Sequence, residues 1–447
     1  MEHFDIAVVG ARVAGAAVAV HLARAGFSVL VLERAVFPSE TPSTHTVQEM
    51  SALGDLGVLG QLHEAGAPVI MRSSLWIDGM DLSAPHVSLP RMSVRRITLD
   101  AILADAAHRA GADVRMGRKV LGIGRHRDRV CAVYYQGPDG SPRTATCSLV
   151  VGADGRSSTV ARLVGARRYD VTYNERGAVW RYYTDMPSPA EFYFCRRERQ
   201  LLLAAPCDNG RTMLAVQPSL AETSAYRAPG MVEQSFLEHA APWGAGEASW
   251  DKLLAAAVPD GEARMILRYP CFFRESAGPG WVLIGDAGHV KDVVTGQGIS
   301  DALRQAENVA ERIQASWGSD RALDRALRGW WLSRDRQARP MYWLSQDMGR
   351  AGTVPLVHRE FFRRISASPG LRDQLQKTLS RKQSPNRLNS SLRFLAVSHG
   401  LLTDPRLRGT GVLSAICSTG RVELARRLQL MMPRPGRPLA QFAQEGA

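Results

Sequence analysis

Three carboxylates in this chain, Glu33, Asp154 and Asp286, each come at the end of a short apolar run. A run of this kind predicts a buried strand, and open α/β sheets bind their ligands beyond the carboxyl ends of the strands. We therefore expect these acids at the ligand-binding edge of a sheet. For Asp154 alone, an ordinary N-cap of a helix that begins near Ser158 is the simpler interpretation.

The first acid completes a dinucleotide-binding pattern. An apolar strand over residues 4–9 leads into Gly10 and Gly15, a helix of small residues follows, and a second strand over residues 27–32 ends at Glu33. Gly10 permits the tight turn, Gly15 lets the helix pack close to the strand, and the helix N-terminus receives a pyrophosphate. Glu33 lies 18 residues after Gly15, where an acid binds ribose hydroxyls.

Arg12 stands where this fingerprint has its second glycine. That glycine normally lets the backbone approach the pyrophosphate. Two outcomes are open at this point: the Arg12 side chain points away from the ligand, or it contributes a charge contact to a phosphate.

The third acid precedes a glycine-containing loop and a long helical pattern over residues 299–313. Gly296 and Gly298 allow a close backbone approach to a ligand. The positive end of the following helix points to the same place as Asp286.

The polar loop over residues 38–48 follows the second strand, and such loops often fold back over a ligand. Its His45 and Gln48 either hydrogen-bond a cofactor or are simply solvated, and the residue types do not decide between the two.

The composition excludes several classes of protein. The net charge of +13 comes almost entirely from arginine, and no nucleic-acid-binding motif accompanies it. The six cysteines lack the close spacing of zinc or redox sites, so we expect reduced thiols and no metal. We see no apolar run long enough to span a membrane and no signal peptide, and we therefore expect a cytoplasmic protein.

The three motifs, in this order, resemble the FAD-dependent monooxygenase family of the para-hydroxybenzoate hydroxylase type, which includes geranylgeranyl-reductase-like flavoproteins. The resemblance covers roughly residues 4–345. Arg96 matches the family's arginine near the FAD phosphates. Ser43-Thr44-His45 with Gln48, and Lys291-Asp292 before Thr295–Ser300, resemble an actinobacterial subgroup.

The resemblance implies FAD as cofactor and NAD(P)H as a transient reductant. It places Glu33 on the adenosine ribose, Asp286 on the ribityl–pyrophosphate region, Asp154 near both FAD and NAD(P)H, and residues 296–299 near the flavin pyrimidine. The implied FAD-binding residues are Gly10, Arg12, Val13, Ala14, Gly15, Glu33, Arg34, Gln48, Arg96, Asp154, Gly285, Asp286, Gly296, Gly298 and Ile299. The candidates nearest the flavin are His45, Gln48, Val293, Gly296 and Gln297. Val293 departs from the family, which usually has proline there.

We predict an α/β fold with a Rossmann-like FAD-binding domain, an inserted antiparallel β-sheet substrate domain and a C-terminal helical region. The first comprises residues 1–70, 95–170 and 276–345, the second residues 71–94 and 171–275, and the third residues 346–447. Aromatic strands in the second domain would cover the flavin, although such stripes more often serve packing. The substrate candidates are Trp76, Trp180, Arg181, Tyr182, Phe192, Phe194, Met213 and Gln217.

The resemblance implies a monooxygenase, a hydroxylase or epoxidase that uses NAD(P)H and O2 on an aromatic, polyketide-like or other bulky apolar substrate in secondary metabolism. One alternative is a flavin-dependent reductase or dehydrogenase of a lipid or polyketide double bond, and another is a non-catalytic flavoprotein. A flavin halogenase fits less well, because the first lysine is Lys119 and that family's Trp-x-Trp-x-Ile-Pro segment is absent.

The last hundred residues contain a stretch rich in basic residues. The simpler interpretation is that these residues lie on the solvent-exposed face of helices. The sharper hypothesis is that the stretch docks an acidic carrier protein or an anionic membrane surface, in an association that weakens with salt. Its residues are Arg372, Lys377, Arg381, Lys382, Arg387 and Arg393.

Overall fold

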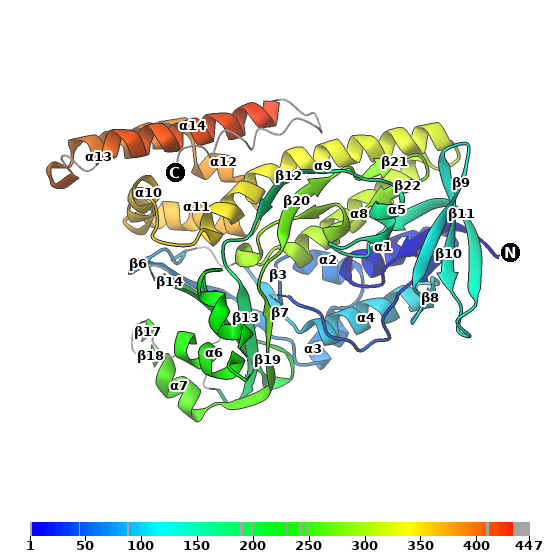
Figure 1. Cartoon of the computed structure of the whole chain (residues 1–447), viewed down its shortest axis with the longest axis horizontal. Coiled ribbons are helices and arrows are strands. Elements are labelled where there is room, and N and C mark those ends of the chain that lie inside the picture. The colour runs from blue at the N-terminus through cyan, green and yellow to red at the C-terminus, as the bar shows by residue number, and fades with distance from the viewer. Residues whose placement is uncertain are drawn as a thin grey trace.

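The computed structural model describes the chain except residues 1, 44, 87–88, 187–190, 198–199, 229, 241–243, 246–247, 408–410 and 432–447. Thr44 of the polar loop and the end of the C-terminal region thus lie outside the described residues. Two large sheets lie beside each other, and helices from the last third of the chain form an outer layer (Figure 1). No helix of the described part is long and apolar enough to cross a membrane.

The first sheet has a parallel centre whose strands expose ligand-binding ends at one edge. Its order is β22 (Trp281–Leu283), β11 (Pro142–Gly152), β1 (Glu2–Val9), β2 (Val29–Leu32) and β8 (Asp113–Arg115). Alternating residues of β1 serve different faces, because strand side chains alternate. Ile6 and Val8 pack with α1 (Val13–Arg24), α4 (Arg96–Arg109) and α8 (Gly298–Ser316), whereas Ala7 and Val9 pack toward α5 (Thr159–Leu163).

Strand β11 is one continuous strand that pairs with two different neighbours. Its first half pairs antiparallel with β10 (Arg129–Gln136), which pairs with β9 (Val120–His126), and its second half pairs parallel with β1. After Pro142, its first residue, the strand contains no glycine or proline before Gly152, so nothing interrupts it.

Two short helices follow the polar loop, separated by a glycine. Helix α2 (Met50–Asp55) ends before Gly57, and α3 (Leu59–Glu64) begins after it. Gly57 has a φ of 73°, a left-handed conformation that stops a helix and that glycine adopts without strain.

The second sheet lies opposite the ligand-binding edge of the first. Its order is β19 (Val258–Ile266), β13 (Ala178–Thr184), β16 (Thr212–Val216), β15 (Gln200–Pro206), β14 (Glu191–Arg197), β5 (Arg72–Ile77) and β6 (Met80–Asp81). Neighbouring strands are antiparallel except β5 and β14, which run parallel. As period two predicts, Trp180 and Tyr182 share one apolar cluster, and Tyr183 belongs to the cluster on the other face.

Smaller elements connect the two sheets. The short strands β3 (Thr46–Val47), β4 (Val69–Ile70) and β7 (Arg91–Ser93) form one sheet, and β12 (Arg168–Tyr173), β20 (Pro270–Arg274) and β23 (His289–Val290) form another. The remaining described elements include β17 (Gly244–Ala245), β18 (Ala248–Ser249), β21 (Ala277–Gly278), α6 (Val232–Ala240) and α7 (Trp250–Ala256).

A long helix, α9 (Asp320–Gly349), links the first sheet to the C-terminal helices. Trp330 and Trp331 are buried in its contact with the main core, as expected of core anchors. The helices that follow are α10 (Leu356–Ser366), α11 (Pro369–Leu379), α12 (Pro385–Leu388), α13 (Ser391–Thr403) and α14 (Val412–Met431).

Gly15 tests how tightly α1 packs against the turn before it. A Cβ at Gly15 would lie well inside van der Waals contact with the carbonyl oxygen of Gly10. We expect Gly15→Ala to lower the free energy of unfolding by about 1–3 kcal/mol or more. The matched control is Gly329→Ala in α9, where a Cβ meets no atom within 4 Å; it should raise stability by about 0.5–1 kcal/mol. Urea unfolding measures both, and equal effects would contradict this packing.

Candidate functional site

A cavity of about 490 Å³ lies between the carboxyl ends of the first sheet and one face of the second. All the residues that the family resemblance assigns to the cofactor line it, except Gly15, Gln48 and Gly296. Among the candidates nearest the flavin, Val293 and Gln297 line it, and His45 does not. Sequence motifs from four separate segments therefore meet at one site.

One end of the cavity is built by the turn between β1 and α1. Gly10 has a φ of 100°, and a Cβ there would lie 2.6 Å from the carbonyl oxygen of Ala153, so a side chain would fill the turn. The buried Glu33 carboxylate accepts hydrogen bonds from the backbone N–H groups of Ala11 (2.8 Å) and Ala35 (2.9 Å). The first N–H groups of α1 have no acceptor within the helix, which makes this end suited to an anion.

Arg12 lines the cavity and is held by a carboxylate that sequence analysis missed. Its guanidinium donates to Asp100 (2.5 Å) and to Ser39 Oγ (3.0 Å). The same Asp100 accepts two 2.9 Å hydrogen bonds from Arg96, and it is 1% exposed. Two cations on one carboxylate leave a net positive charge beside the α1 N-terminus. The Arg12 side chain thus does not point away from the cavity, and its guanidinium is held in place by Asp100.

Asp154 lines the cavity, but its carboxylate is used to begin α5. It accepts hydrogen bonds from Ser158 Oγ (2.5 Å) and from the N–H groups of Thr159 (2.6 Å) and Val160 (3.1 Å). Burial raises the pKa of this carboxyl despite these bonds. The capping interpretation is therefore what its geometry shows.

Asp286 is a carboxylate on the cavity wall. It lies in a short turn, Gly285–Ala287, after β22, and its side chain is exposed. It accepts no hydrogen bond from any residue that the structure describes. Burial raises the pKa of Asp286, against the opposing effect of Arg96 and Arg156. An exposed carboxylate on the cavity wall with no hydrogen-bond donor among the described residues is available to a polar ligand.

Val293 uses a backbone group that proline would lack. Its N–H donates to the Tyr269 hydroxyl at 3.2 Å, and both residues line the cavity. The preceding Asp292 caps the same turn by accepting from Val294 N at 3.0 Å. The loop is therefore held in place by side-chain hydrogen bonds at the position where the family usually has a rigid ring.

The C-terminal region reaches this loop through a buried ionic network. Lys291 donates to Gln297 Oε1 (2.9 Å) and pairs with Asp301, which also pairs with Arg381 (3.3 Å). Burial lowers the pKa of Lys291 to about 8, although Asp301 acts in the opposite direction. Burial alone would raise the pKa of Asp301, but Arg381 and Lys291 keep it well below its usual range.

A second contact from the C-terminal region joins the same loop, because Gln297 Nε2 donates to the carbonyl oxygen of Leu379 at 2.5 Å. Sequence analysis gave residues 346–447 no role at the site. No sequence pattern could have predicted these contacts, because Asp301 and Gln297 lie about 80 residues before their partners Arg381 and Leu379.

His45 and Gln48 are buried, so they are not part of a solvated loop. His45 Nε2 hydrogen-bonds the Tyr182 hydroxyl of the second sheet, and burial lowers the pKa of His45 to about 3, which keeps the ring neutral. The backbone N–H of Gln48 donates to Ser300 Oγ at 2.9 Å. Neither residue lines the cavity. They join the loop after β2 to Tyr182 of β13 and to Ser300 of α8.

The substrate candidates divide into two groups. Trp180, Met213 and Gln217 line the cavity, together with apolar residues that sequence analysis missed, Leu203, Ala215 and Ile266. Ala215 lies directly opposite Trp180 on β16, so only the strand register could have found it.

The other candidates lie elsewhere. Arg181 pairs with Glu233 on the far face, and Trp76 packs there too. Phe194 and Tyr182 are in the core of the near face, and Phe192 lies under the Arg91 guanidinium at 4.6 Å. For these residues the aromatic stripe serves packing.

The basic stretch of the C-terminal region is partly used inside the molecule. Arg372 pairs with Asp81 (3.3 Å), Arg381 pairs with Asp301, and Arg393 donates to Gln374 (2.8 Å). Half of the six basic residues are therefore not available to a partner. The six cysteines are free thiols, and four of them are buried.

Comparison with known proteins adds to this geometry. The model of the family described as "FAD binding domain" matches residues 3–327. The chain is 23% identical over 462 residues to rifampicin monooxygenase of Streptomyces venezuelae, which covers 94% of this chain and 89% of that protein. It is 28% identical over 337 residues to menaquinone reductase of Mycolicibacterium smegmatis, covering 71% and 78%. The myxobacterial chondrochloren halogenase structure has a similar fold, with a TM-score of 0.68, 19% identity and coverage of 89% and 97%.

Asp292 gives a pH-dependent test of this site. Burial raises its pKa to about 7, so between pH 4 and 7 the folded state binds a proton that the unfolded state has lost. The stability that this group contributes therefore falls as pH rises through that window. Asp292→Asn keeps the acceptor for Val294 N and does not titrate. We expect its stability relative to the wild type to rise from pH 4 to pH 8, by at most about 4 kcal/mol.

Urea unfolding at several pH values measures this difference. The control is Asp105→Asn on α4, whose carboxylate is 53% exposed and pairs with Arg109 on the surface. A difference between Asp292→Asn and the wild type that stays constant with pH would contradict the raised pKa.

Proposed function

The chain belongs to the FAD-dependent monooxygenase family of the para-hydroxybenzoate hydroxylase type, and we propose that it is an NAD(P)H-dependent hydroxylase or epoxidase of a bulky apolar substrate. FAD is its cofactor, and the enzyme is an oxidoreductase. The observation that carries the proposal is the single cavity that joins the cofactor edge of the first sheet to an apolar wall of the second. Its six free cysteines are consistent with a cytoplasmic location.

The cavity suits FAD because its groups match the cofactor in order. The α1 N-terminus with Arg12 and Arg96 would hold the pyrophosphate, and Glu33 would hold the adenosine ribose. Asp286, which lacks a protein partner, would accept hydrogen bonds from the ribityl hydroxyls. The positive end of α8, beginning at Gly298, would favour negative charge on the flavin pyrimidine.

Bound FAD supplies the electron transfer and the activation of O2, and the protein supplies position and a dry environment. Residues 1–70, 95–170 and 276–345 would hold the cofactor, and residues 71–94 and 171–275 would cover the substrate. NAD(P)H would dock transiently, near the wall that Asp154 shapes by holding α5.

The wall opposite the cofactor edge favours an aromatic or polyketide-like substrate. Trp180, Leu203 and Met213 present apolar surface to the cavity, which excludes water from the reacting groups. The side-chain amide of Gln217 also lines the cavity and has no hydrogen-bond partner among the described residues. It would orient a polar group of the substrate.

A second candidate function is the reduction of an apolar double bond, such as that of a lipid or polyketide. Such a reaction needs a proton at the substrate as well as a hydride. The Asp292 carboxyl lines the cavity, and its pKa of about 7 keeps a proton on it in a large fraction of molecules at neutral pH. The similarity to a menaquinone reductase also favours this candidate.

The structure gives little support to the hypothesis that an acidic carrier protein docks on the basic stretch. Three of the six residues in the basic stretch have partners within the molecule, and the exposed remainder is Lys377, Lys382 and Arg387. We therefore propose a freely diffusing substrate, with the cavity rather than the basic stretch as its binding site.

Two substitutions test the cofactor assignments. We expect Asp286→Ala to weaken FAD binding tenfold to a hundredfold, because losing a charge-assisted hydrogen bond costs about 1.5–3 kcal/mol. Glu33→Ala should act in the same direction and less severely. Flavin content after purification and titration of the flavin-free protein measure the effect. Asp105→Ala is the surface control. Undiminished FAD binding in Asp286→Ala would contradict its role, and a wild type that never binds FAD would indicate a non-catalytic protein.

The reaction itself is tested by its dependence on oxygen. NAD(P)H consumption should require O2, be stimulated by aromatic polyketides, and yield a product that carries one oxygen atom from labelled O2. Turnover that continues without O2 and saturates a double bond would instead establish the reductase. Mass spectrometry of the product and parallel aerobic and anaerobic assays separate the two outcomes.

A further inference from the structure

The last two described helices carry leucines on their outer sides. On α13 these are Leu392, Leu395 and Leu402, and on α14 they are Leu413, Leu424 and Leu428. Leu392 is 79% exposed and Leu413 is 66% exposed. The spacing in each helix places them on one side. We call these six residues the leucine face.

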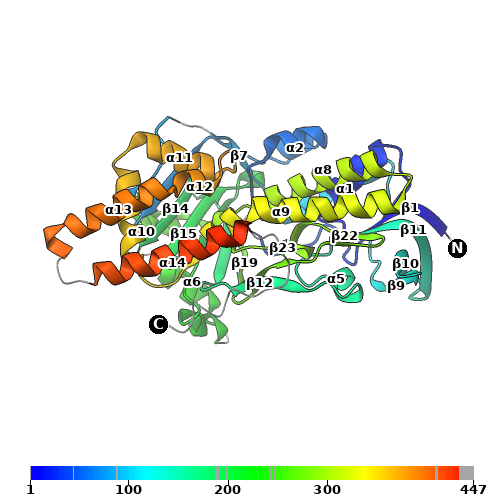
Figure 2. The same cartoon turned by 90° about the horizontal axis from the view of Figure 1, so that it is seen from above.

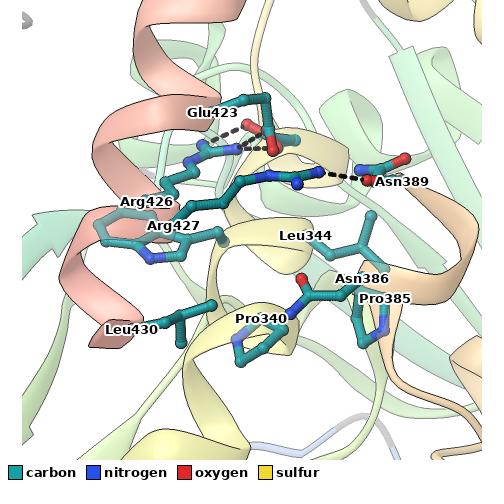
Figure 3. Close-up of a pocket in the computed structure, with 11 residues that line it drawn as sticks. Pro340, Leu344, Pro385, Asn386, Asn389, Glu423, Arg426, Arg427 and Leu430 are labelled. Carbon is teal, nitrogen blue, oxygen red and sulfur yellow. Dashed lines mark hydrogen bonds and ion pairs between the residues drawn. The ribbon is translucent and has the colours of Figure 1, made fainter. Parts of the chain in front are cut away.

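The inner sides of the same helices are already occupied. Val397 and Leu401 of α13 pack with Val412 of α14 in a buried cluster that includes residues of α10. Arg426 of α14 donates to both oxygens of Asp347 on α9 (2.7 and 2.8 Å) (Figure 3). The hollow beside this ion pair measures about 30 Å³, which is about the space of one water molecule.

Helices α13 and α14 are neighbours at the outside of the C-terminal region. They contact each other and both pack on α10 (Figures 1 and 2). The 20 residues of α14 make that helix about 30 Å long at 1.5 Å per residue. Exposed apolar surface of this extent on a soluble fold marks an interaction site.

Basic residues outnumber acids around the leucine face. Arg421 lies on the exposed side of α14 among the leucines, and exposed basic residues follow on the adjacent α11–α12 segment with no ion pair to any described residue; they are Lys377, Lys382 and Arg387. Among the nearby acids, Asp404 pairs with Arg406 (2.8 Å) and Glu423 pairs with Arg426 (3.1 Å), and Asp373 of α11 accepts a hydrogen bond from the His86 N–H at 3.2 Å. The face therefore combines apolar side chains with a fringe in which basic residues predominate.

We propose that the leucine face binds the surface of an anionic lipid bilayer. Its leucines would enter the boundary between headgroups and acyl chains, and the basic residues would contact acidic headgroups, as amphipathic helices do when they lie in the interface. A second copy of this chain fits the face less well, because pairing it with itself brings the positive fringes together. The helices lie on the bilayer and do not span it. This surface is outside the cavity, so the proposal does not depend on the reaction.

Vesicle flotation with the full-length, FAD-loaded protein tests the proposal. We expect at least about tenfold stronger partitioning onto vesicles of phosphatidylcholine mixed with phosphatidylglycerol than onto phosphatidylcholine alone, and a loss at high salt. Leu392→Ser combined with Leu424→Ser should lower partitioning at least about tenfold. The matched control is Val36→Ser with Leu121→Ser, since both residues are exposed outside the leucine face. Arg421→Glu, which keeps the leucines, should also weaken binding.

The outcomes separate the occupants of the face. Flavin absorbance and circular dichroism verify that each variant is folded, and the wild-type comparison of the two lipids decides even if a variant does not fold. Absent vesicle binding overturns the proposal, as does binding that is equal for neutral and anionic lipid and insensitive to salt. A dimer detected by sedimentation and abolished by the leucine substitutions, without vesicle binding, would assign the face to a second copy instead.

Discussion

The buried carboxylate of Asp301 is the interaction on which the arrangement of this site depends. It lies in the first turn of α8, pairs with Lys291 from the loop before that helix, and pairs with Arg381 from the C-terminal region. Removing one member of a buried ionic group leaves an unpaired charge, so the three segments are stable only together. The loop over residues 291–297 on the cavity wall is thus held by contacts with α8 and with the C-terminal region.

Local patterns predicted what local geometry determines. The turn at Gly10, the close packing at Gly15 and the acids that follow β2 and β22 were all readable, because glycine spacing and apolar runs dictate short-range structure. The same patterns led to a Rossmann-like sheet, an inserted sheet and C-terminal helices, and the structure has all three. The family resemblance added the cofactor, which the residues alone only suggested as a dinucleotide.

What the sequence could not predict is pairing between distant residues. Arg12 and Arg96 were both singled out, but the acid that joins them, Asp100, lies on a helix whose face is known only once the fold is known. The apolar wall of the cavity likewise depends on strand register, which brings Ala215 opposite Trp180. Phe194 lies opposite the cavity residue Leu203 and still belongs to the core. Contacts between strands and ion pairs between distant residues produce no repeating pattern in a single sequence, so they cannot be predicted from it.

The hydrogen bond from Val293 N to Tyr269 has a consequence for how this chain can change. A proline fixes its own backbone angle and needs no neighbour to do so. Here the conformation of the loop is shared with a hydroxyl from the segment between β19 and β20. Replacing Tyr269 with phenylalanine while residue 293 stays valine would therefore leave the Val293 N–H without this acceptor, whereas a proline at 293 would have no N–H to satisfy.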